Sequence, residues 1–287
     1  MQLNRRAALV ALAAMAAPPA WAQAAGPISA GPISPGQIAE IIASPNRSDA
    51  DRTNDMRRKP QPMLEFIAIH PGIVAFDISA AGGYTTELLA RAVGPTGKVY
   101  GQSRPPTAAA STPPAQREGN SRPDLPTAAP PAGAPRPSPV ALAEREAKLQ
   151  AAHVAAAPIV AVSRPFEDPV PDELVGKIDL VTLMFNYHDL GHLGTDRAAM
   201  NKAVFRALKK GGEFVIADHA GRSGTGIGEA GTLHRIEEAF LRQEVEAAGF
   251  KLAAEGTFLR NPNDPKDKNT PDPPQPKDEF VLKFVKP

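Results

Sequence analysis

Two histidines of this sequence lie where they could move a proton or contact a substrate. His188 stands in the segment FNYHDL with Asp189 directly after it, and His219 follows a short apolar run that ends in Asp218. An imidazole changes charge near neutral pH and a carboxylate can orient its ring, which suits general-base chemistry. We therefore take His188 and His219 as catalytic candidates, with Asp189 orienting His188. The alternative for His188 is a loop or capping histidine.

Residues of the same segments, together with His234, could in principle bind a metal ion. Asp189, Asp218, His219 and His234 carry the carboxylate and imidazole groups that several divalent ions accept. Their separations along the chain match no compact ligand motif, so the sequence predicts no metal site. Cysteine is absent, which excludes disulfides, thiolate metal sites and cysteine nucleophiles.

A second candidate site lies in VAFDISAAGG, residues 74–83, which predicts an apolar strand, an acid at Asp77 and a tight turn. At the end of a first parallel strand, small residues let a ligand approach the backbone and the N-terminus of the next helix. The small residues of this turn include Ser79, Ala81, Gly82 and Gly83. A dinucleotide fingerprint places its acid roughly 20 positions after the glycines. Because Asp77 precedes the turn, a nicotinamide-dependent reductase is the poorer match.

The elements that would position these residues alternate between strand and helix. Apolar runs predict parallel strands at residues 73–78, 98–101, 159–162, 177–185 and 213–218. Apolar residues at helical spacing predict helices at residues 85–93, 196–208 and 233–248. Two late strands, at 256–260 and 279–285, have a connection too short for a helical crossover, so we expect antiparallel pairing. The pattern predicts an α/β fold, a doubly wound and mostly parallel sheet with an antiparallel last strand.

Two proline-rich segments interrupt this pattern. Residues 103–139 are dominated by proline and alanine and hold few large apolar side chains, so this insertion is predicted to be disordered. Residues 261–277 form a second proline-rich loop. Both are insertions in one domain, residues 63–287, which follows a lead-in with short helices at residues 25–62.

Two flanking segments could close over the candidate site. The predicted helix at residues 48–59 carries Arg52, Asp55 and Arg57, and the glycine-rich loop at residues 220–231 is long enough to act as a lid. A solvated charged helix and a flexible connection are the simpler alternatives.

The first 24 residues predict export. Arg5 and Arg6 precede the apolar run 7–17, and small residues suited to cleavage follow. The run is shorter than the roughly 20 apolar residues that span a bilayer, so we expect cleavage and no stable membrane anchor. The basic pair leaves both the general secretory and the twin-arginine routes open, and the expected location is the periplasm.

The order of several segments resembles the class I S-adenosylmethionine-dependent methyltransferases. VAFDISAAGG resembles the first motif of that family, KIDLVTL its fourth strand, RALKKGGEFVIAD its fifth, and EVEAAGFKL the helix and turn before its sixth. The resemblance covers roughly residues 63–287. More narrowly, RSDADRTNDMRRKP, FNYHDL, DHAGRSGTG and TLHRIEEAFLRQEVEAAGF resemble a group of exported bacterial predicted methyltransferases.

The resemblance implies S-adenosylmethionine as cofactor and assigns residues to it. Asp77 and the backbone of residues 79–83 would face its methionine part, and Asn186 would lie beside the transferred methyl group. The remaining assignments are Gln102 at the ribose and Phe166 and Glu167 near the adenine. Two departures from the family matter. Ser79 and Ala81 replace common glycines, and a Cβ disfavours positive φ; Gln102 replaces an acid.

The expected function is methyl transfer to an unidentified small molecule or envelope component. The alternative is a non-catalytic exported binding protein that retains the fold. A formal net charge of +1, with basic and acidic residues interleaved, argues against a nucleic-acid partner, so a small-molecule substrate is expected.

Overall fold

The computed structural model describes residues 31–105, 136–269, 271 and 275–287. Its centre is a seven-stranded sheet in the order β3-β2-β1-β4-β5-β7-β6. All neighbours pair in parallel except β7, which runs antiparallel to both β5 and β6. The prediction of a doubly wound, mostly parallel α/β sheet with an antiparallel last strand is confirmed. The strands are β1 (Val74–Ile78), β2 (Lys98–Ser103), β3 (Ile159–Ser163), β4 (Ile178–Met184), β5 (Leu208–His219), β6 (Lys251–Gly256) and β7 (Glu279–Val285).

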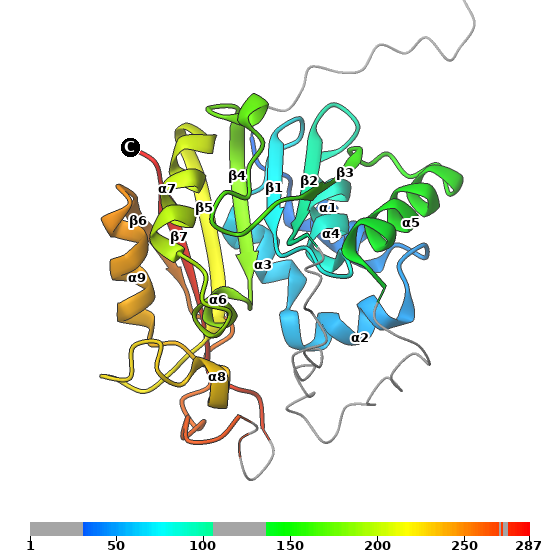
Figure 1. Cartoon of the computed structure of the whole chain (residues 1–287). Helices are drawn as coiled ribbons and strands as arrows, with labels where there is room; N and C mark the ends of the chain where they lie inside the picture. Colours follow the sequence, from blue (N-terminus) through cyan, green and yellow to red (C-terminus); the bar gives the residue numbers. More distant parts are fainter. Residues whose placement is uncertain (1–30, 106–135, 270, 272–274) are drawn as a thin grey trace, which may run out of the picture.

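Helices cover both faces of the sheet and its carboxyl edge (Figure 1). One face is covered by α1 (Pro35–Ala43), α3 (Pro60–Ile67), α4 (Tyr84–Val93) and α5 (Ser138–Ala151). The other face is covered by α7 (Arg197–Ala207) and α9 (Glu238–Ala247). Three short helices, α2 (Asp49–Arg58), α6 (Tyr187–His192) and α8 (Ala230–Leu233), lie toward the carboxyl ends of the parallel strands; a single 3-10 turn, η1 (Asp172–Leu174), precedes β4.

The two-sided burial explains why the central strands are apolar along their whole length. In β4, Leu180 faces the core under α3 and α4, whereas Val181 faces the core under α7 and α9. Successive strand residues point to opposite faces, so a strand covered on both sides needs apolar residues at every position. The polar exceptions on these strands, such as Asp77 and Thr182, therefore call for a specific explanation.

Three element predictions need correction. The helix predicted at 233–248 is two helices, because α8 ends at Leu233 and His234 has φ 51°, a left-handed conformation that stops a helix. Between them, Ile236 pairs with Ala220 in an isolated parallel bridge. The late strand predicted at 256–260 is instead β6, which ends at Gly256. The strand predicted at 213–218 begins earlier, because β5 starts at Leu208, the last residue of the helix predicted at 196–208.

The long proline-rich insertion is described only at its ends. Ser103 still belongs to β2 and Ser138 begins α5, a helix that the sequence analysis did not predict. Residues 106–135, like the predicted signal peptide within residues 1–30, lie outside the described residues. In the described part of 261–277 the backbone forms turns and bends. None of the helices described has the length and apolar content needed to cross a bilayer.

Candidate functional site

The turn between β1 and α4 has the backbone of a glycine loop although glycine is missing at two of its positions. Ser79 has φ 59° and Ala81 has φ 46°, and Gly83 follows with φ 79°. A left-handed φ costs a non-glycine residue about 1–2 kcal/mol, so the surroundings must hold these two residues in place. The N–H of Ala80 donates to the carbonyl of Gln102 at 2.8 Å, which fixes the turn to β2.

Gln102 is the residue that stabilises this turn from the side. Its side chain is fully buried, its Oε1 accepts from the N–H of Ser79 at 3.1 Å, and its Nε2 donates to the carbonyl of Arg164 at 2.7 Å. Both ends of the amide are therefore bonded within the protein. The structure shows Gln102 as a support for the turn, and Gln102 does not line the cavity described next, so its assignment to the ribose stays a prediction. Phe166 is buried in the core and Glu167 is half-buried, and neither lines the cavity described next.

A cavity of about 390 Å³ lies between this turn, α2 and the carboxyl end of β4. That volume is typical of a site for a small organic molecule. Six of the residues proposed from the sequence line it: Asp77, Ser79, Ala81, Gly82, Asn186 and Asp189. The remaining lining residues are Ala50, Asp51, Asn54, Arg58, Ala80, Tyr84, Thr85, Arg145, Met184 and Phe185.

Asp77 links three elements at the base of the cavity. It is 2% exposed, and its carboxylate accepts from Thr86 Oγ1 of α4 at 2.6 Å and from Thr182 Oγ1 of β4 at 2.8 Å. Burial raises the pKa of Asp77 to about 6, against the lowering effect of the two threonine hydroxyls. The acid that the sequence analysis assigned to the cofactor therefore also holds β1, β4 and α4 together.

Arg145 of α5 forms a clamp over the turn, which the sequence analysis missed. Its Nε donates to the carbonyl of Gly82 at 2.6 Å. Its Nη1 and Nη2 donate to the carboxylate of Asp51 on α2 at 2.9 and 2.8 Å, and Nη1 also pairs with Glu87 of α4. Burial alone would raise the pKa of Asp51, but the bonds to Arg145 outweigh it and lower the pKa. A Cβ on Gly83 would lie 2.7 Å from Leu142, so α5 packs directly on the turn.

Helix α2 borders the cavity as expected, but through different residues. Asp51, Asn54 and Arg58 line the cavity, rather than Arg52 and Arg57. These three positions are spaced three and four apart and so share one helix face. Arg57 instead points to Glu279 of β7, with 3.2 Å between Nη1 and Oε1. The sequence analysis identified the right helix but not its inward face.

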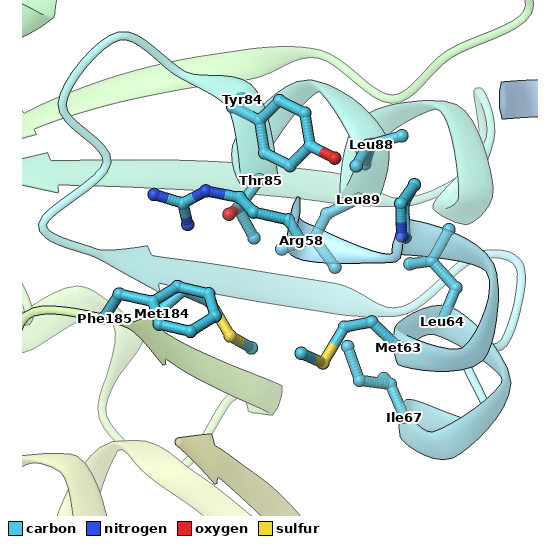
Figure 2. Close-up of a pocket in the computed structure, with 11 residues that line it drawn as sticks. Arg58, Met63, Leu64, Ile67, Tyr84, Thr85, Leu88, Leu89, Met184 and Phe185 are labelled. Atoms are coloured by element: carbon cyan, nitrogen blue, oxygen red, sulfur yellow. The ribbon is translucent and has the colours of Figure 1, made fainter. Parts of the chain in front are cut away.

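An apolar pocket of about 30 Å³ adjoins the cavity (Figure 2). Figure 2 shows the ends of Met63 and Met184 pointing toward one another across it, with Ile67 below and Leu88 and Leu89 of α4 behind. The pocket shares Arg58, Tyr84, Thr85, Met184 and Phe185 with the larger cavity. Its small volume has room for a group of only a few atoms.

His188 is oriented by a carboxylate that is distant in sequence. Its Nδ1 lies 2.6 Å from Oδ1 of Asp218, and its backbone N–H donates to Oδ2 of the same residue at 2.8 Å. Both side chains are fully buried. The orienting role that the sequence analysis gave to Asp189 thus belongs to Asp218. Asp189 lies instead on the other side of the ring, with Oδ1 3.2 Å from Nε2 of His188.

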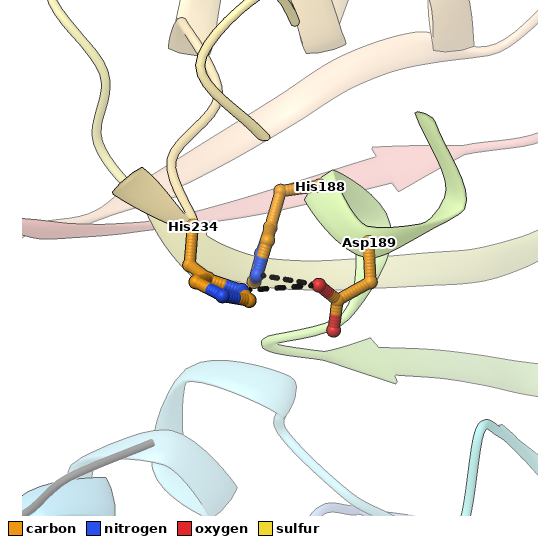
Figure 3. Close-up of side chains that lie close together, drawn as sticks. All are labelled: His188, Asp189 and His234. Atoms are coloured by element: carbon orange, nitrogen blue, oxygen red, sulfur yellow. Dashed lines mark hydrogen bonds and ion pairs between the residues drawn. The ribbon is translucent and has the colours of Figure 1, made fainter. Parts of the chain in front are cut away.

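Asp189 is the meeting point of two imidazoles (Figure 3). Besides the 3.2 Å contact with His188, its Oδ1 lies 3.3 Å from Nδ1 of His234, which approaches from the end of α8. Asn186 donates to Oδ2 at 2.8 Å and fixes the carboxylate from below. His188, Asp189 and His234 thus form a histidine cluster. Asp189 lines the cavity, whereas the adjacent His188 does not.

The charges of this cluster limit its acid-base chemistry. Burial alone would lower the pKa of His188, but the carboxylates of Asp218 and Asp189 outweigh it and raise the pKa to about 10. Burial would raise the pKa of Asp189, but the two histidines lower it. The carboxylates on both sides of the His188 ring thus favour its protonated form, whereas a general base needs the neutral form.

His219 belongs to a neighbouring buried network. Its Nδ1 lies 2.9 Å from Oε1 of Glu279, and its ring contacts Phe185 with 5.6 Å between centroids. The ring is 1% exposed and does not line the cavity. His219 therefore supports the cavity wall at Phe185 from behind, in contrast to the direct role that the sequence analysis expected.

Comparisons with known proteins establish the fold and leave the reaction open. No family model matches the chain, and no curated protein matches it. The chain is similar to the solved structure of an S-adenosylmethionine-dependent methyltransferase from Aquifex aeolicus, with 13% identity, a TM-score of 0.50, and 88% of this chain and 98% of the other covered. It is also similar to the cyclase SpnF, with 13% identity, a TM-score of 0.51, and coverage of 85% and 86%. At this identity the likeness shows the methyltransferase fold alone.

Proposed function

We propose that this chain binds S-adenosylmethionine in the cavity at the carboxyl edge of the sheet and transfers its methyl group to a small-molecule or envelope acceptor. The observation that carries the proposal is the conformation of the β1–α4 turn. Ser79, Ala81 and Gly83 all have positive φ, although two of them are not glycine. Strain of this kind persists where the surroundings maintain it, commonly at ligand sites.

The cavity suits the methionine part of this cofactor. Its wall carries both signs of charge, with Arg58 on α2 and the carboxylates of Asp77 and Asp189 at the strand ends. A molecule with both an ammonium and a carboxylate group is complementary to such a wall. In addition, Oδ1 of Asn186 is buried without a hydrogen-bond partner in the described structure. An unsatisfied acceptor on a cavity wall is a natural partner for an N–H or O–H of a ligand.

We propose that the adenosine part is held differently from the family pattern. Gln102 supports the turn, and Phe166 and Glu167 lie away from the cavity. Asn54 of α2 is one of the polar side chains that line the cavity, whereas the carboxylate of Asp51 on the same helix face is paired with Arg145. We therefore propose that α2 contributes to nucleoside binding in this chain.

Methyl transfer requires little acid-base chemistry from the residues of the cavity. When bound, the cofactor supplies an electrophilic methyl group, so the chain mainly has to align the acceptor and exclude water. Asn186 and Asp189 follow β4, at the start of α6, where they can orient the polar part of an acceptor. The apolar pocket between Met63 and Met184 can hold a small apolar group of the same molecule.

The test is titration calorimetry of S-adenosylmethionine and S-adenosylhomocysteine into the purified chain. The blocking variant is Gly82→Leu, because Gly82 lines the cavity, has no positive φ, and an added Cβ there meets nothing within 4 Å. The matched control is Gly36→Leu, an exposed glycine of α1 whose added Cβ would have only Ser34 Oγ near it, at 3.9 Å.

We expect binding in the wild type and in Gly36→Leu, and a loss of at least about tenfold in Gly82→Leu. If the folded, ligand-free wild type binds neither compound, the enzyme proposal fails. The chain would then be a binding protein that keeps the methyltransferase fold.

We also propose that the chain is exported and belongs with the exported bacterial predicted methyltransferases that its segments resemble. The support is the basic pair Arg5 and Arg6 ahead of the apolar run 7–17. Expression in a bacterium followed by fractionation tests this, since export yields a shortened chain outside the cytoplasm. A full-length chain retained in the cytoplasm would contradict it, and an Arg5→Lys, Arg6→Lys variant separates the twin-arginine route from general secretion.

A further inference from the structure

We propose that His188, Asp189 and His234 bind one divalent transition-metal ion at the wall of the cavity. These three residues are the group within the described structure whose potential ligand atoms all lie within 4.8 Å of one another. Figure 3 shows both imidazoles directed at the Asp189 carboxylate. The sequence analysis predicted no metal site because the fold, and not a local motif, brings His234 to the other two.

The distances suit a shared ion. Oδ1 of Asp189 lies 3.2 Å from Nε2 of His188 and 3.3 Å from Nδ1 of His234. Metal bonds of about 2.0–2.2 Å to histidine nitrogen and carboxylate oxygen place neighbouring ligand atoms about 3.0–3.5 Å apart. The ligands therefore need little movement to close around an ion.

The unsatisfied nitrogen of His188 is an independent sign of a ligand. Nε2 is buried and has no hydrogen-bond partner in the described structure, since the contact with Asp189 lacks hydrogen-bond geometry. Buried polar atoms without partners are rare in folded proteins and call for an explanation. A metal ion at this position would give Nε2 a partner.

The supporting contacts are those that metal-binding histidines commonly have. Asp218 contacts Nδ1 of His188 at 2.6 Å, which leaves Nε2 directed at the site, and this carboxylate–histidine arrangement recurs around metal ions. Asn186 fixes the Asp189 carboxylate through Oδ2 and leaves Oδ1 for the ion. The first two ligands are thus held in position before any ion binds.

The third ligand is held in place by its neighbour. Arg235 is fully buried, pairs with Asp264 at 2.8 Å and donates to the carbonyl of Ala220 at 3.0 Å. This anchor fixes the segment between α8 and α9 and maintains the left-handed φ of 51° at His234. His234 therefore reaches the cluster from a segment that has its own buried support.

The ligand set indicates the class of ion. Two imidazoles and one carboxylate suit Zn²⁺, Co²⁺, Fe²⁺ and similar ions, whereas Mg²⁺ and Ca²⁺ prefer oxygen ligands throughout. Three protein ligands leave coordination positions open, and Asp189 lines the cavity. An ion here would hold an oxygen atom of the acceptor. This role rests on the proposed function, but the binding of the ion is independent of it.

The experiment uses the chain without a histidine tag, treated with chelator and dialysed. Zn²⁺ is titrated by calorimetry, and Co²⁺ is added while the visible absorption of the bound ion is recorded. The test variants are His234→Asn, at the partly exposed ligand, and Asp189→Asn. The matched control is His192→Asn, an exposed histidine of the same short helix α6 that lies outside the cluster.

We expect one equivalent of ion in the wild type and in His192→Asn, with a visible Co²⁺ band, and affinity reduced by at least about tenfold in both ligand variants. The absence of stoichiometric binding by the folded wild type, or equal binding by His234→Asn and wild type, overturns the proposal. The titrations contain no S-adenosylmethionine, so a failure of the cofactor proposal would not alter these outcomes.

Discussion

Nδ1 of His188 lies 2.6 Å from Oδ1 of Asp218, and both side chains are buried. Asp218 is the last but one residue of β5 and His188 is the second residue of α6, the helix after β4, so the pair joins two adjacent strands at the edge where the cavity opens. The same carboxylate also accepts from the N–H of His188 and the N–H of His219. One buried acid thus sets the position of both predicted catalytic histidines.

The first prediction concerns this acid. In Asp218→Asn, the amide is a weaker partner for the His188 ring and no longer fixes which nitrogen faces Asp189. We expect affinity for Zn²⁺ to fall by about 10–100-fold, the usual effect of removing such a support. Calorimetry measures the change, with Asp172→Asn, an exposed acid, as the control. Unchanged Zn²⁺ affinity in a folded Asp218→Asn chain would contradict the positioning role.

The second prediction is a pH dependence that comes from Asp77. Its pKa is raised from 3.8 to about 6, so the folded state holds this proton more tightly than the unfolded state. The stabilisation of the folded state by the proton on Asp77 is fully present below about pH 4 and is lost as the pH rises through about 6. Relative to Asp77→Asn, the wild type should therefore lose about 3 kcal/mol of stability across that window.

Urea unfolding of the two proteins at pH 4, 5, 6 and 7 measures this difference. The comparison with Asp77→Asn cancels contributions from acids that both proteins share. A difference that stays constant, or that grows in favour of the wild type as the pH rises, would show that the pKa of Asp77 is not raised.

The third prediction concerns the clamp formed by Arg145. Replacement by Met keeps much of the side-chain volume but leaves Asp51, which is 3% exposed, without its bidentate partner. An unpaired buried charge destabilises a protein by about 3–5 kcal/mol. Because protonation of Asp51 relieves part of this cost, we expect the free energy of unfolding to fall by about 3 kcal/mol.

Urea denaturation measures the loss, and Arg242→Met is the control. Arg242 pairs with Glu246 on the surface of α9, with both side chains more than a third exposed, so its removal should cost less than about 1 kcal/mol. Similar losses in the two variants would mean that the clamp contributes no more than a surface ion pair.

The fourth prediction concerns the strained turn. Ala81→Gly removes a Cβ from a residue with φ 46°, which relieves about 1–2 kcal/mol of strain, against about 0.5–1 kcal/mol for the greater freedom of glycine in the unfolded chain. We expect stability that is unchanged or higher by up to about 1.5 kcal/mol. Ala39→Gly in α1 should instead destabilise by about 1 kcal/mol. Equal losses in the two variants, measured by thermal unfolding, would contradict the strain.

The fold was largely predictable because its signal is local. Apolar runs such as that of β4 and the small residues after β1 gave the parallel strands and their turn without any tertiary information. The errors fell where a local pattern was overridden. His234 interrupts a continuous helical periodicity, since the buried Arg235–Asp264 pair holds that segment in place through the proline-rich loop.

The site was less predictable, because its key contacts join residues far apart in the chain. Asp189 was chosen as the partner of His188 for its adjacency, and it does lie 3.2 Å from Nε2, but the shorter contact of 2.6 Å, at Nδ1, comes from Asp218 on the next strand. Gln102 was judged by its type as a weak ribose partner. Only the structure shows that its amide is bonded to Ser79 and Arg164. Arg145 gave no signal, because nothing in the sequence indicated which helix would cover the turn.

Because Gln102 supports the turn, a loop of this kind can be recognised in a sequence by more than its glycines. Where a buried amide at the end of β2 bonds the N–H of Ser79, the left-handed backbone no longer depends on glycine at every such position. A search pattern built on glycine alone would pass over such chains. A more faithful signature pairs the small-residue turn with an amide side chain about 23 positions later, the separation of Ser79 and Gln102.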